Sequence, residues 1–343
     1  MTPAPPLFAH VAALTDGVGM FEHALLARPR TAGGYCVDDV ARALVATCRA
    51  EDLDAARPLS RTAMNRLREV YLSFLENAQT PDGRVVNRRE TSGRLSGTAG
   101  ADDAWGRSLW AFGTAAGRSR DSSVVQRAGV RFTLGASRRS PWARSMAFAG
   151  LGAFEVLRAD PGHQVASELL RDATALVGPF LRYQSWPWPE PRLTYANAVL
   201  ADVLLAAGDA LDDPKLVHQG LTVLEWLVEL QTTGEHLSLV PAAGWVTGEP
   251  WPGFDQQPIE AATLADACAR AFELTGDPRW SQTVAMAAAW FFGDNDAGAA
   301  LYDEASGGCC DGLEPLGRNE NQGAESALAF VTTVQHAHRL VGV

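Results

Sequence analysis

Two pairs of adjacent aspartates stand where apolar helical patterns begin. Asp38 and Asp39 lie in GGYCVDDVARAL, and Asp102 and Asp103 lie in DDAWGRSLWAFG. One carboxylate is enough to cap a helix, because a single side chain can satisfy the free N–H groups of the first turn. The second acid of each pair is therefore available for chemistry, and a carboxyl group suits general acid–base catalysis.

Amides, carboxylates and aromatic side chains also occupy the starts of the other apolar helical patterns and the loops before them. Amides and carboxylates match sugar hydroxyls, and the apolar face of a sugar ring stacks on tryptophan. Trp142 and Glu260 stand at two of these starts. The pattern predicts a carbohydrate site, whose further candidate contacts are Tyr35, Trp105, Arg144, Trp186, Trp188, Tyr195, Asn197, Trp245, Trp251, Gln257, Asn321, Gln322 and Glu325.

Each candidate also has a purely structural interpretation. Any single aspartate in the set is a possible helix cap. Glu260 follows Pro258 in PIEAATL, and a proline followed by an acidic residue is the usual sequence pattern of a helix start. The tryptophans of the long loops could simply pin those loops to the body. The functional interpretation depends on convergence, because several helix starts on one face offer one kind of chemistry.

Apolar residues at helical spacing predict about twelve helices and little strand. Helices rich in small and apolar residues on all sides alternate with amphipathic, charged ones, so each consecutive pair is a helical hairpin. Six buried helices inside six outer ones predict an all-α (α/α)6 toroid, with residues 1–343 as one domain. The expected helical segments are 6–28, 37–50, 61–79, 102–117, 121–136, 141–158, 163–183, 193–209, 213–232, 258–275, 278–293 and 321–341.

The loops indicate which end of the toroid carries the site. Connections within a hairpin are short, whereas those leading into a buried helix are long and rich in Gly, Pro, Trp and acids. Long loops on one face of a compact scaffold usually build a site. These connections are 80–101, 184–192, 233–257 and 294–320, and all lie at the N-terminal ends of the buried helices.

Composition narrows the class of partner. The formal net charge of −11 disfavours nucleic acid and anionic membrane surfaces. No apolar stretch is long enough for a membrane span, and the first residues lack the pattern of a signal peptide. The odd number of cysteines, five, fits a reducing cytoplasm better than a disulfide framework. The sequence makes no prediction of oligomeric state.

Metal and nucleotide motifs are weak or missing in the sequence. GGCCDG at 307–312 has two adjacent cysteines but no histidine at ligand spacing, so we expect no structural zinc. Neither a G-x-S-x-G elbow nor a phosphate-binding loop occurs. We therefore expect no cofactor and no metal, and a carbohydrate as the binding partner.

Several segments resemble the six-hairpin glycosidase superfamily, and the resemblance covers the whole chain. They are GYCVDDVARAL, DDAWGRSLWAFG, FDQQPIEAATLADACARAFELTGDPRW, AWFFGDND and RNENQGAESALAF. Within that superfamily the chain resembles the actinobacterial methylmannose polysaccharide hydrolases, which are endo-acting α-mannosidases. The resemblance implies hydrolysis of an α-mannoside-type oligo- or polysaccharide, usually with inversion.

Inversion needs a general acid at the leaving oxygen and a general base that holds water on the opposite face. We assign the base to the Asp38/Asp39 pair, because the helix dipole favours an ionised carboxylate at a helix start. We assign the acid to Glu260, whose flanking residues are apolar, so that desolvation would keep its proton available. The reverse assignment stays open, with Asp102, Asp103 and Glu325 in reserve.

Two other classes of function compete with hydrolysis. The same fold carries sugar epimerases, phosphorylases and polysaccharide lyases; histidines are sparse at the helix starts, which counts against an epimerase. A phosphorylase would need a basic phosphate pocket, for which Arg107, Arg144, Arg192 and Arg318 are available. The non-enzymatic alternative is a glycan-binding partner of a glycosyltransferase.

Overall fold

The computed structural model describes residues 7–52, 59–177, 186–251 and 253–342. Within these ranges the chain forms twelve α-helices, and the inner and outer kinds alternate as predicted. Their bounds are α1 Ala9–Ala13, α2 Val37–Arg49, α3 Arg61–Ala78, α4 Asp103–Arg118, α5 Ser122–Gly135, α6 Ala143–Ala159, α7 Gln164–Val177, α8 Val199–Ala210, α9 Pro214–Leu230, α10 Pro258–Thr275, α11 Pro278–Phe291 and α12 Ala324–Val341.

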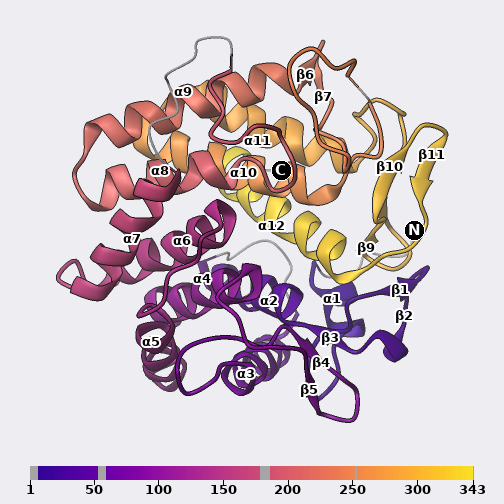
Figure 1. Ribbon diagram of the computed structural model, residues 1–343. Helices are drawn as coiled ribbons and strands as arrows, with labels where there is room; N and C mark the ends of the chain where they lie inside the picture. The colour runs from indigo at the N-terminus through magenta and orange to yellow at the C-terminus, as the bar shows by residue number, and fades with distance from the viewer. Residues whose placement is uncertain (1–6, 53–58, 178–185, 252, 343) are drawn as a thin grey trace.

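The inner helices form a closed ring. Contacts run from α2 to α4, α6, α8, α10 and α12, and α12 packs back against α2. Each outer helix, from α3 to α11, packs on the inner helix that precedes it. In Figure 1 the first half of the chain lies below, the second half lies above, and α12 returns beside the N-terminal part. The predicted (α/α)6 fold is therefore confirmed.

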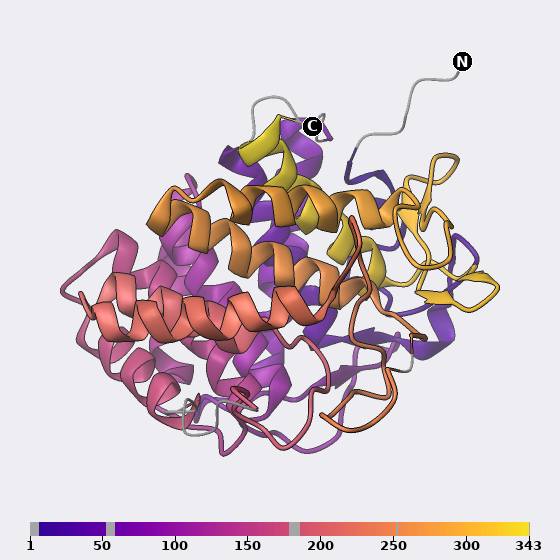
Figure 2. The same ribbon diagram turned by 90° about the horizontal axis from the view of Figure 1, so that it is seen from above.

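Small residues let two inner helices approach closely. Gly113 of α4 and Gly152 of α6 face each other, and a Cβ on Gly113 would lie 2.1 Å from the carbonyl oxygen of Gly152. The same crossing repeats at Gly106, where a Cβ would lie 2.2 Å from the carbonyl oxygen of Ser145. These helices carry small and apolar residues on all sides, and the small residues thus allow contact between the helix backbones. Figure 2 shows the helices of the second half running side by side.

The N-terminal segment differs from the expected helix over 6–28. Its helix, α1, covers only Ala9–Ala13 and packs against α12, so the sixth outer position is filled only in part. A tight turn ends it, in which Asp16 Oδ1 accepts the backbone N–H groups of Val18 (2.7 Å) and Gly19 (3.0 Å). Aspartate favours such turns by bonding its own backbone two residues on.

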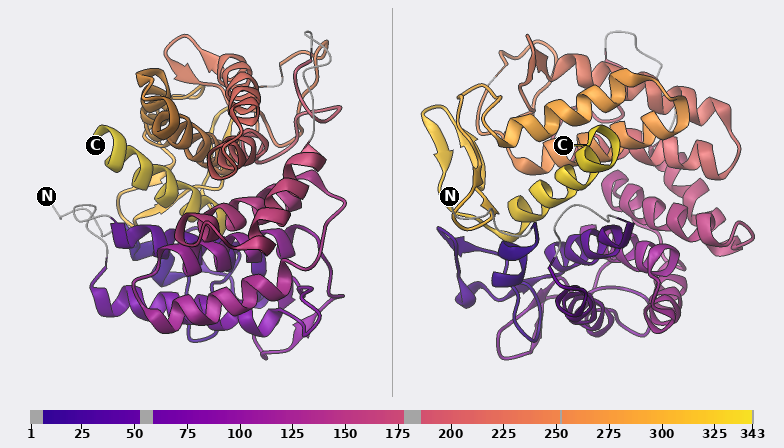
Figure 3. Two further views of the ribbon diagram at one scale, coloured as in Figure 1. Left: turned by 90° about the vertical axis from the view of Figure 1, so that its left-hand side faces the viewer. Right: turned by 180° about the vertical axis from the view of Figure 1, so that it is seen from behind.

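The strands are short hairpin pieces in the loops that lead to inner helices. Figures 1 and 3 show them gathered on one side of the ring. The three-stranded sheet β3–β4–β5 pairs Tyr35 with Arg89 and so fixes the entry to α2. The strands are β1 Ala24–Leu25, β2 Arg28–Pro29, β3 Tyr35–Cys36, β4 Arg88–Arg89, β5 Leu95–Ser96, β6 Thr232–Thr233, β7 His236–Leu237, β8 Tyr302–Asp303, β9 Gly308–Cys309, β10 Gly312–Glu314 and β11 Gly317–Asn319.

Helix length and hydropathy also bear on membranes. Among the helices of the described ranges, none is long and apolar enough to cross a bilayer.

Candidate active site

A cavity of about 290 Å³ opens where the N-terminal ends of α2, α10 and α12 meet. Four predicted site residues line it, and they are Asp38, Asp39, Gln257 and Glu325. The other residues of its wall are Glu22, His23, Cys36, Arg42, Asp311, Gly323 and Ser326. The wall is dominated by carboxylates and polar groups, which suits a polyhydroxylated ligand.

Asp39 is the most buried acid of this cavity wall, with 3% of its surface exposed. Its Oδ1 accepts a hydrogen bond of 2.6 Å from Arg42 Nη1, one helical turn later. Burial raises the pKa of Asp39 to about 7, although Arg42 opposes the shift. A carboxyl group with this pKa can hold a proton near neutral pH and donate it.

Arg42 joins Asp39 to a second carboxylate from the other end of the chain. Its Nη2 donates to Glu325 Oε2 at 2.5 Å, so one guanidinium bridges α2 and the first turn of α12. The side chain of Glu325 is 38% exposed, whereas that of Asp39 is 5% exposed. The two carboxylates thus face one cavity from different environments.

Asp38 lies in the first turn of α2 beside this network. Its Oδ2 accepts weak hydrogen bonds from Cys36 Sγ and Asn87 Nδ2, both at 3.4 Å. Its Oδ1 lies 3.9 Å from Arg107 Nε and has no hydrogen-bond partner among the described residues. Asp38 therefore lines the cavity, and one of its carboxylate oxygens is buried without a partner among the described residues.

The second aspartate pair sits at the start of α4. Asp102 is exposed and forms no side-chain cap, whereas Asp103 accepts a hydrogen bond from Ser145 Oγ at 2.7 Å and another from the Tyr195 hydroxyl. The ring of Tyr195 lies 6.0 Å from the Arg107 guanidinium. Asp103 therefore ties the starts of α4 and α6 to the loop before α8, and neither aspartate of this pair lines the cavity.

Glu260 does not line the cavity. It is buried in the first turn of α10, and its carboxylate accepts the backbone N–H groups of Ala196 and Asn197 and the Asn197 Nδ2 at 2.9 Å. Burial raises its pKa to about 7, although these donors oppose the shift. Glu260 thus anchors the chain in front of α8.

That anchored segment explains why α8 begins at Val199 and not near 193. Ala196 has a positive φ of 47°, which a helix cannot contain. Arg144 supports the same turn by donating to the carbonyl oxygen of Tyr195 at 2.5 Å, to Asn197 Oδ1 at 3.1 Å and to Glu190 at 2.5 Å. Arg144, Tyr195 and Asn197 therefore hold the rim of the ring together.

The loop tryptophans pack on one another. Trp186 contacts Trp226 at 5.4 Å and Trp245 at 5.9 Å between ring centroids, Trp188 contacts Trp226 at 5.9 Å, and Trp245 contacts Trp251 at 5.4 Å. This cluster matches the loop-pinning interpretation. Trp186, Trp245 and Trp251 stay half-buried and Trp188 is buried.

Four other predicted contacts have structural positions. Tyr35 is buried, and its hydroxyl donates to Asp16 at 2.6 Å. Trp105 is fully buried, and its indole N–H donates to the carbonyl of Gly135. These core positions correct the expectation that either ring faces a ligand. Asn321 and Gln322 anchor the loops before α12, through Leu26 N and Asp303 respectively.

The sequence interpretation missed part of the cavity wall. Arg42 had a visible signal, because it follows Asp39 at the i,i+3 spacing of an ion pair on one helix face. Glu22 and His23 come from the segment that was expected to be helical, so no sequence pattern placed them at this cavity. Asp311 follows the cysteine pair and accepts the Gly323 N–H at 2.7 Å in front of α12.

Glu22, Cys36 and Asp39 bring possible metal-ligand atoms within 4.8 Å of one another. Two observations disfavour a metal here. Arg42 already donates a hydrogen bond to the Asp39 carboxylate. Burial raises the pKa of the Cys36 thiol, so the thiolate that would bind a metal is disfavoured.

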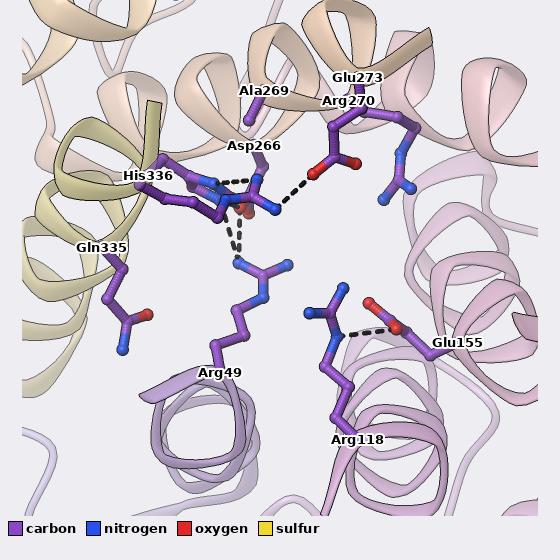
Figure 4. A pocket seen from close by; sticks show the side chains of 10 residues that line it. Arg49, Arg118, Glu155, Asp266, Ala269, Arg270, Glu273, Gln335 and His336 are labelled. Atoms are coloured by element: carbon purple, nitrogen blue, oxygen red, sulfur yellow. Dashed lines mark hydrogen bonds and ion pairs between the residues drawn. The ribbon is translucent and has the colours of Figure 1, made fainter. Parts of the chain in front are cut away.

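A smaller cavity of about 50 Å³ lies at the other end of the inner helices (Figure 4). Ion pairs converge there: Arg49 binds Asp266 at 2.6 Å, and Arg118 binds Glu155 at 2.8 Å. Arg49 and Arg118 are the last residues of α2 and α4, where a cation complements the helix dipole. This end is therefore a network that closes the ring, and the candidate site is the carboxylate-lined mouth.

Neither a family model nor a curated protein matches the sequence. Solved structures do match the fold. A sugar epimerase from a ruminal bacterium has a TM-score of 0.70 and 11% identity, and the match covers 97% of this chain and 96% of the epimerase. A D-mannose isomerase has a TM-score of 0.69 and 10% identity, covering 98% and 97%.

The GH76 α-mannanase BT2949 from Bacteroides thetaiotaomicron matches with a TM-score of 0.65 and 11% identity, covering 98% of this chain and 96% of the mannanase. At these identities the likeness establishes the (α/α)6 barrel. It does not choose between the reactions of these proteins.

Proposed function

We propose that this protein is a glycoside hydrolase that cleaves an α-mannoside-type oligo- or polysaccharide with inversion. The observation that carries the proposal is the pair of carboxylates at the mouth, Asp39 and Glu325, bridged by Arg42. Two titratable groups whose environments differ in this way are suited to divide the acid and base roles. The mannoside preference rests on the sequence resemblance and agrees with the mannanase among the similar folds.

In the proposed reaction Asp39 is the general acid. Burial raises its pKa to about 7, so it carries a proton for the leaving glycosidic oxygen at neutral pH. Glu325 is the general base and takes a proton from the water that attacks the opposite face of the sugar. Arg42 holds both groups, and it stabilises the charge that Asp39 gains when its proton leaves.

Glu260 is the alternative proton donor, because burial raises its pKa to about 7 as well. Its carboxylate is, however, saturated by donors from Ala196 and Asn197 and is not among the residues that line the cavity. Asp38, which also lines the cavity, is the alternative base.

Epimerisation of a sugar is the second candidate, and the epimerase and isomerase among the similar folds favour it. The described wall of the cavity contains one histidine, His23, whose side chain is 57% exposed. Carboxylates and not paired histidines therefore dominate the mouth, which supports hydrolysis.

The test is incubation with α-mannans, methylated mannans, α-glucans, free mannose and cellobiose, with analysis of all products. New reducing ends from a polysaccharide support hydrolysis. Conversion of mannose or cellobiose into an isomer, with no new reducing ends from any glycan, would replace hydrolysis by epimerisation.

A further inference from the structure

Trp142 presents its ring to solvent. All ten tryptophans lie in the described residues, and Trp142 is the one that is exposed, at 64%. None of the aromatic contacts found in these residues includes its ring. An exposed indole forgoes the stabilisation that burial would give, and its flat apolar face is available to stack on a ligand ring.

The backbone of Trp142 is held by hydrogen bonds while its ring is exposed. Trp142 is the N-cap residue of α6, its N–H donates to Ser140 Oγ at 3.2 Å, and its carbonyl accepts the N–H of Met146 at 3.1 Å. An N-cap residue of an inner helix stands at the mouth of the ring. The ring of Trp142 is thus held on the same face of the molecule as the carboxylate-lined cavity.

Neighbouring helices connect the cavity to Trp142 along the rim. Asp38 of α2 lies 3.9 Å from Arg107 of α4, and Asp103 at the start of α4 binds Ser145 at the start of α6 at 2.7 Å. Packed helices lie 8–10 Å apart, so α2 and α6, two positions apart in a ring of six, are separated by roughly 14–17 Å. One sugar ring held at Asp39 does not reach Trp142.

We propose that Trp142 is the aromatic platform of a remote subsite, which stacks a pyranose ring of the same glycan chain whose glycosidic bond lies in the cavity. The inference rests on the proposed function and adds the size of the substrate. It requires a chain of several sugar residues running along the rim from α2 to α6. A mono- or disaccharide substrate would leave Trp142 without a role.

Binding of chains of increasing length tests this subsite. Titration calorimetry would compare the unsubstituted protein with Trp142→Ala, Trp142→Phe and the exposed-residue control Val130→Ala on outer helix α5. All four would also carry Asp39→Asn to suppress cleavage during the titration, and the ligands are α-manno- and malto-oligosaccharides from the disaccharide upward. We expect Trp142→Ala to weaken binding of the longest chains by about 10-fold. Binding of the disaccharide stays unchanged, Trp142→Phe keeps most of the affinity, and Val130→Ala keeps all of it.

Each other outcome overturns a distinct claim. An equal loss of affinity at every chain length, or no loss at any length, overturns the remote subsite. If long chains bind through Trp142 but none is cleaved, the subsite stands and the proposed hydrolysis fails. If chains are cleaved and Trp142→Ala changes nothing, hydrolysis stands and the subsite fails. No binding of any chain, together with no cleavage by the wild type, overturns both.

Discussion

Asp39 and Glu260 are both buried carboxyl groups whose pKa burial raises to about 7. Their partners differ. Asp39 faces the cavity and is bound by one guanidinium, whereas Glu260 accepts three N–H groups from two neighbouring residues. A proton donor must reach the leaving oxygen, so in the proposed reaction access to the cavity favours Asp39 as the acid, and saturation by its donors assigns Glu260 a positioning role.

Substitution of these two acids separates their roles. We expect Asp39→Asn to lower kcat by about 10²–10⁴-fold, the usual contribution of a general acid. Glu260→Gln turns amide hydrogens toward the N–H groups of Ala196 and Asn197, which costs about 1–3 kcal/mol of unfolding free energy. It should change kcat far less. Steady-state kinetics and urea unfolding of both variants provide the measurement; an inactive Glu260→Gln beside an active Asp39→Asn would assign the acid to Glu260.

The pH dependence of activity follows from Asp39. Because its pKa is raised from 3.8 to about 7, the protonated form is lost as pH rises through 7, and kcat/KM should fall about tenfold per pH unit above it. The same proton favours the folded state: this contribution is full below pH 3.8 and is lost as pH rises to about 7. A pH–rate profile that stays flat between pH 6 and 9 would exclude this assignment.

At the scale of elements, helical periodicity located the scaffold well. The helix expected at 258–275 is α10 with the same bounds, and most others agree within a few residues. The exceptions have local causes, namely the Asp16 turn that ends α1 and the positive φ of Ala196 before α8. Periodicity reports burial along one element, so it does not show turns that tertiary contacts fix.

The wall of the cavity was predictable where it is formed by helix starts. Asp38, Asp39 and Glu325 were placed at one mouth, and they do line one cavity. The sequence did not place Glu22, because it comes from a loop whose position depends on packing against the last helix. Trp105 was misplaced because its start-of-helix position does not reveal that its ring turns into the core.

The close approach of α4 and α6 gives a stability prediction with an internal control. Gly113→Ala would place a methyl group 2.1 Å from the Gly152 carbonyl oxygen. We therefore expect the free energy of unfolding to fall by about 1–3 kcal/mol or more. Gly129 lies on outer helix α5, and a Cβ added there would have no atom within 4 Å. Gly129→Ala should therefore raise the free energy of unfolding by about 0.5–1 kcal/mol. Chemical denaturation measures both, and a stable Gly113→Ala would show that the two helices do not pack through these glycines.

Across the whole molecule, the two ends of the ring differ in the side chains that line them. At one end Arg42 links the first and last inner helices within the carboxylate-lined cavity. At the other end Arg49 of α2 binds Asp266 of α10, which His336 of α12 also contacts at 2.5 Å. Ring closure thus brings residues from both ends of the chain together, so that Asp39 of α2 and Glu325 of the neighbouring α12 share the guanidinium of Arg42.

The configuration of the first product tests the proposed reaction most directly. Proton NMR during hydrolysis of an α-mannan records which anomer forms before mutarotation. A base that activates water on the face of the sugar opposite the leaving oxygen gives inversion, so the proposed mechanism predicts that the β-anomer appears first. Initial release of the α-anomer, or no cleavage of any glycan offered, would contradict the proposed mechanism.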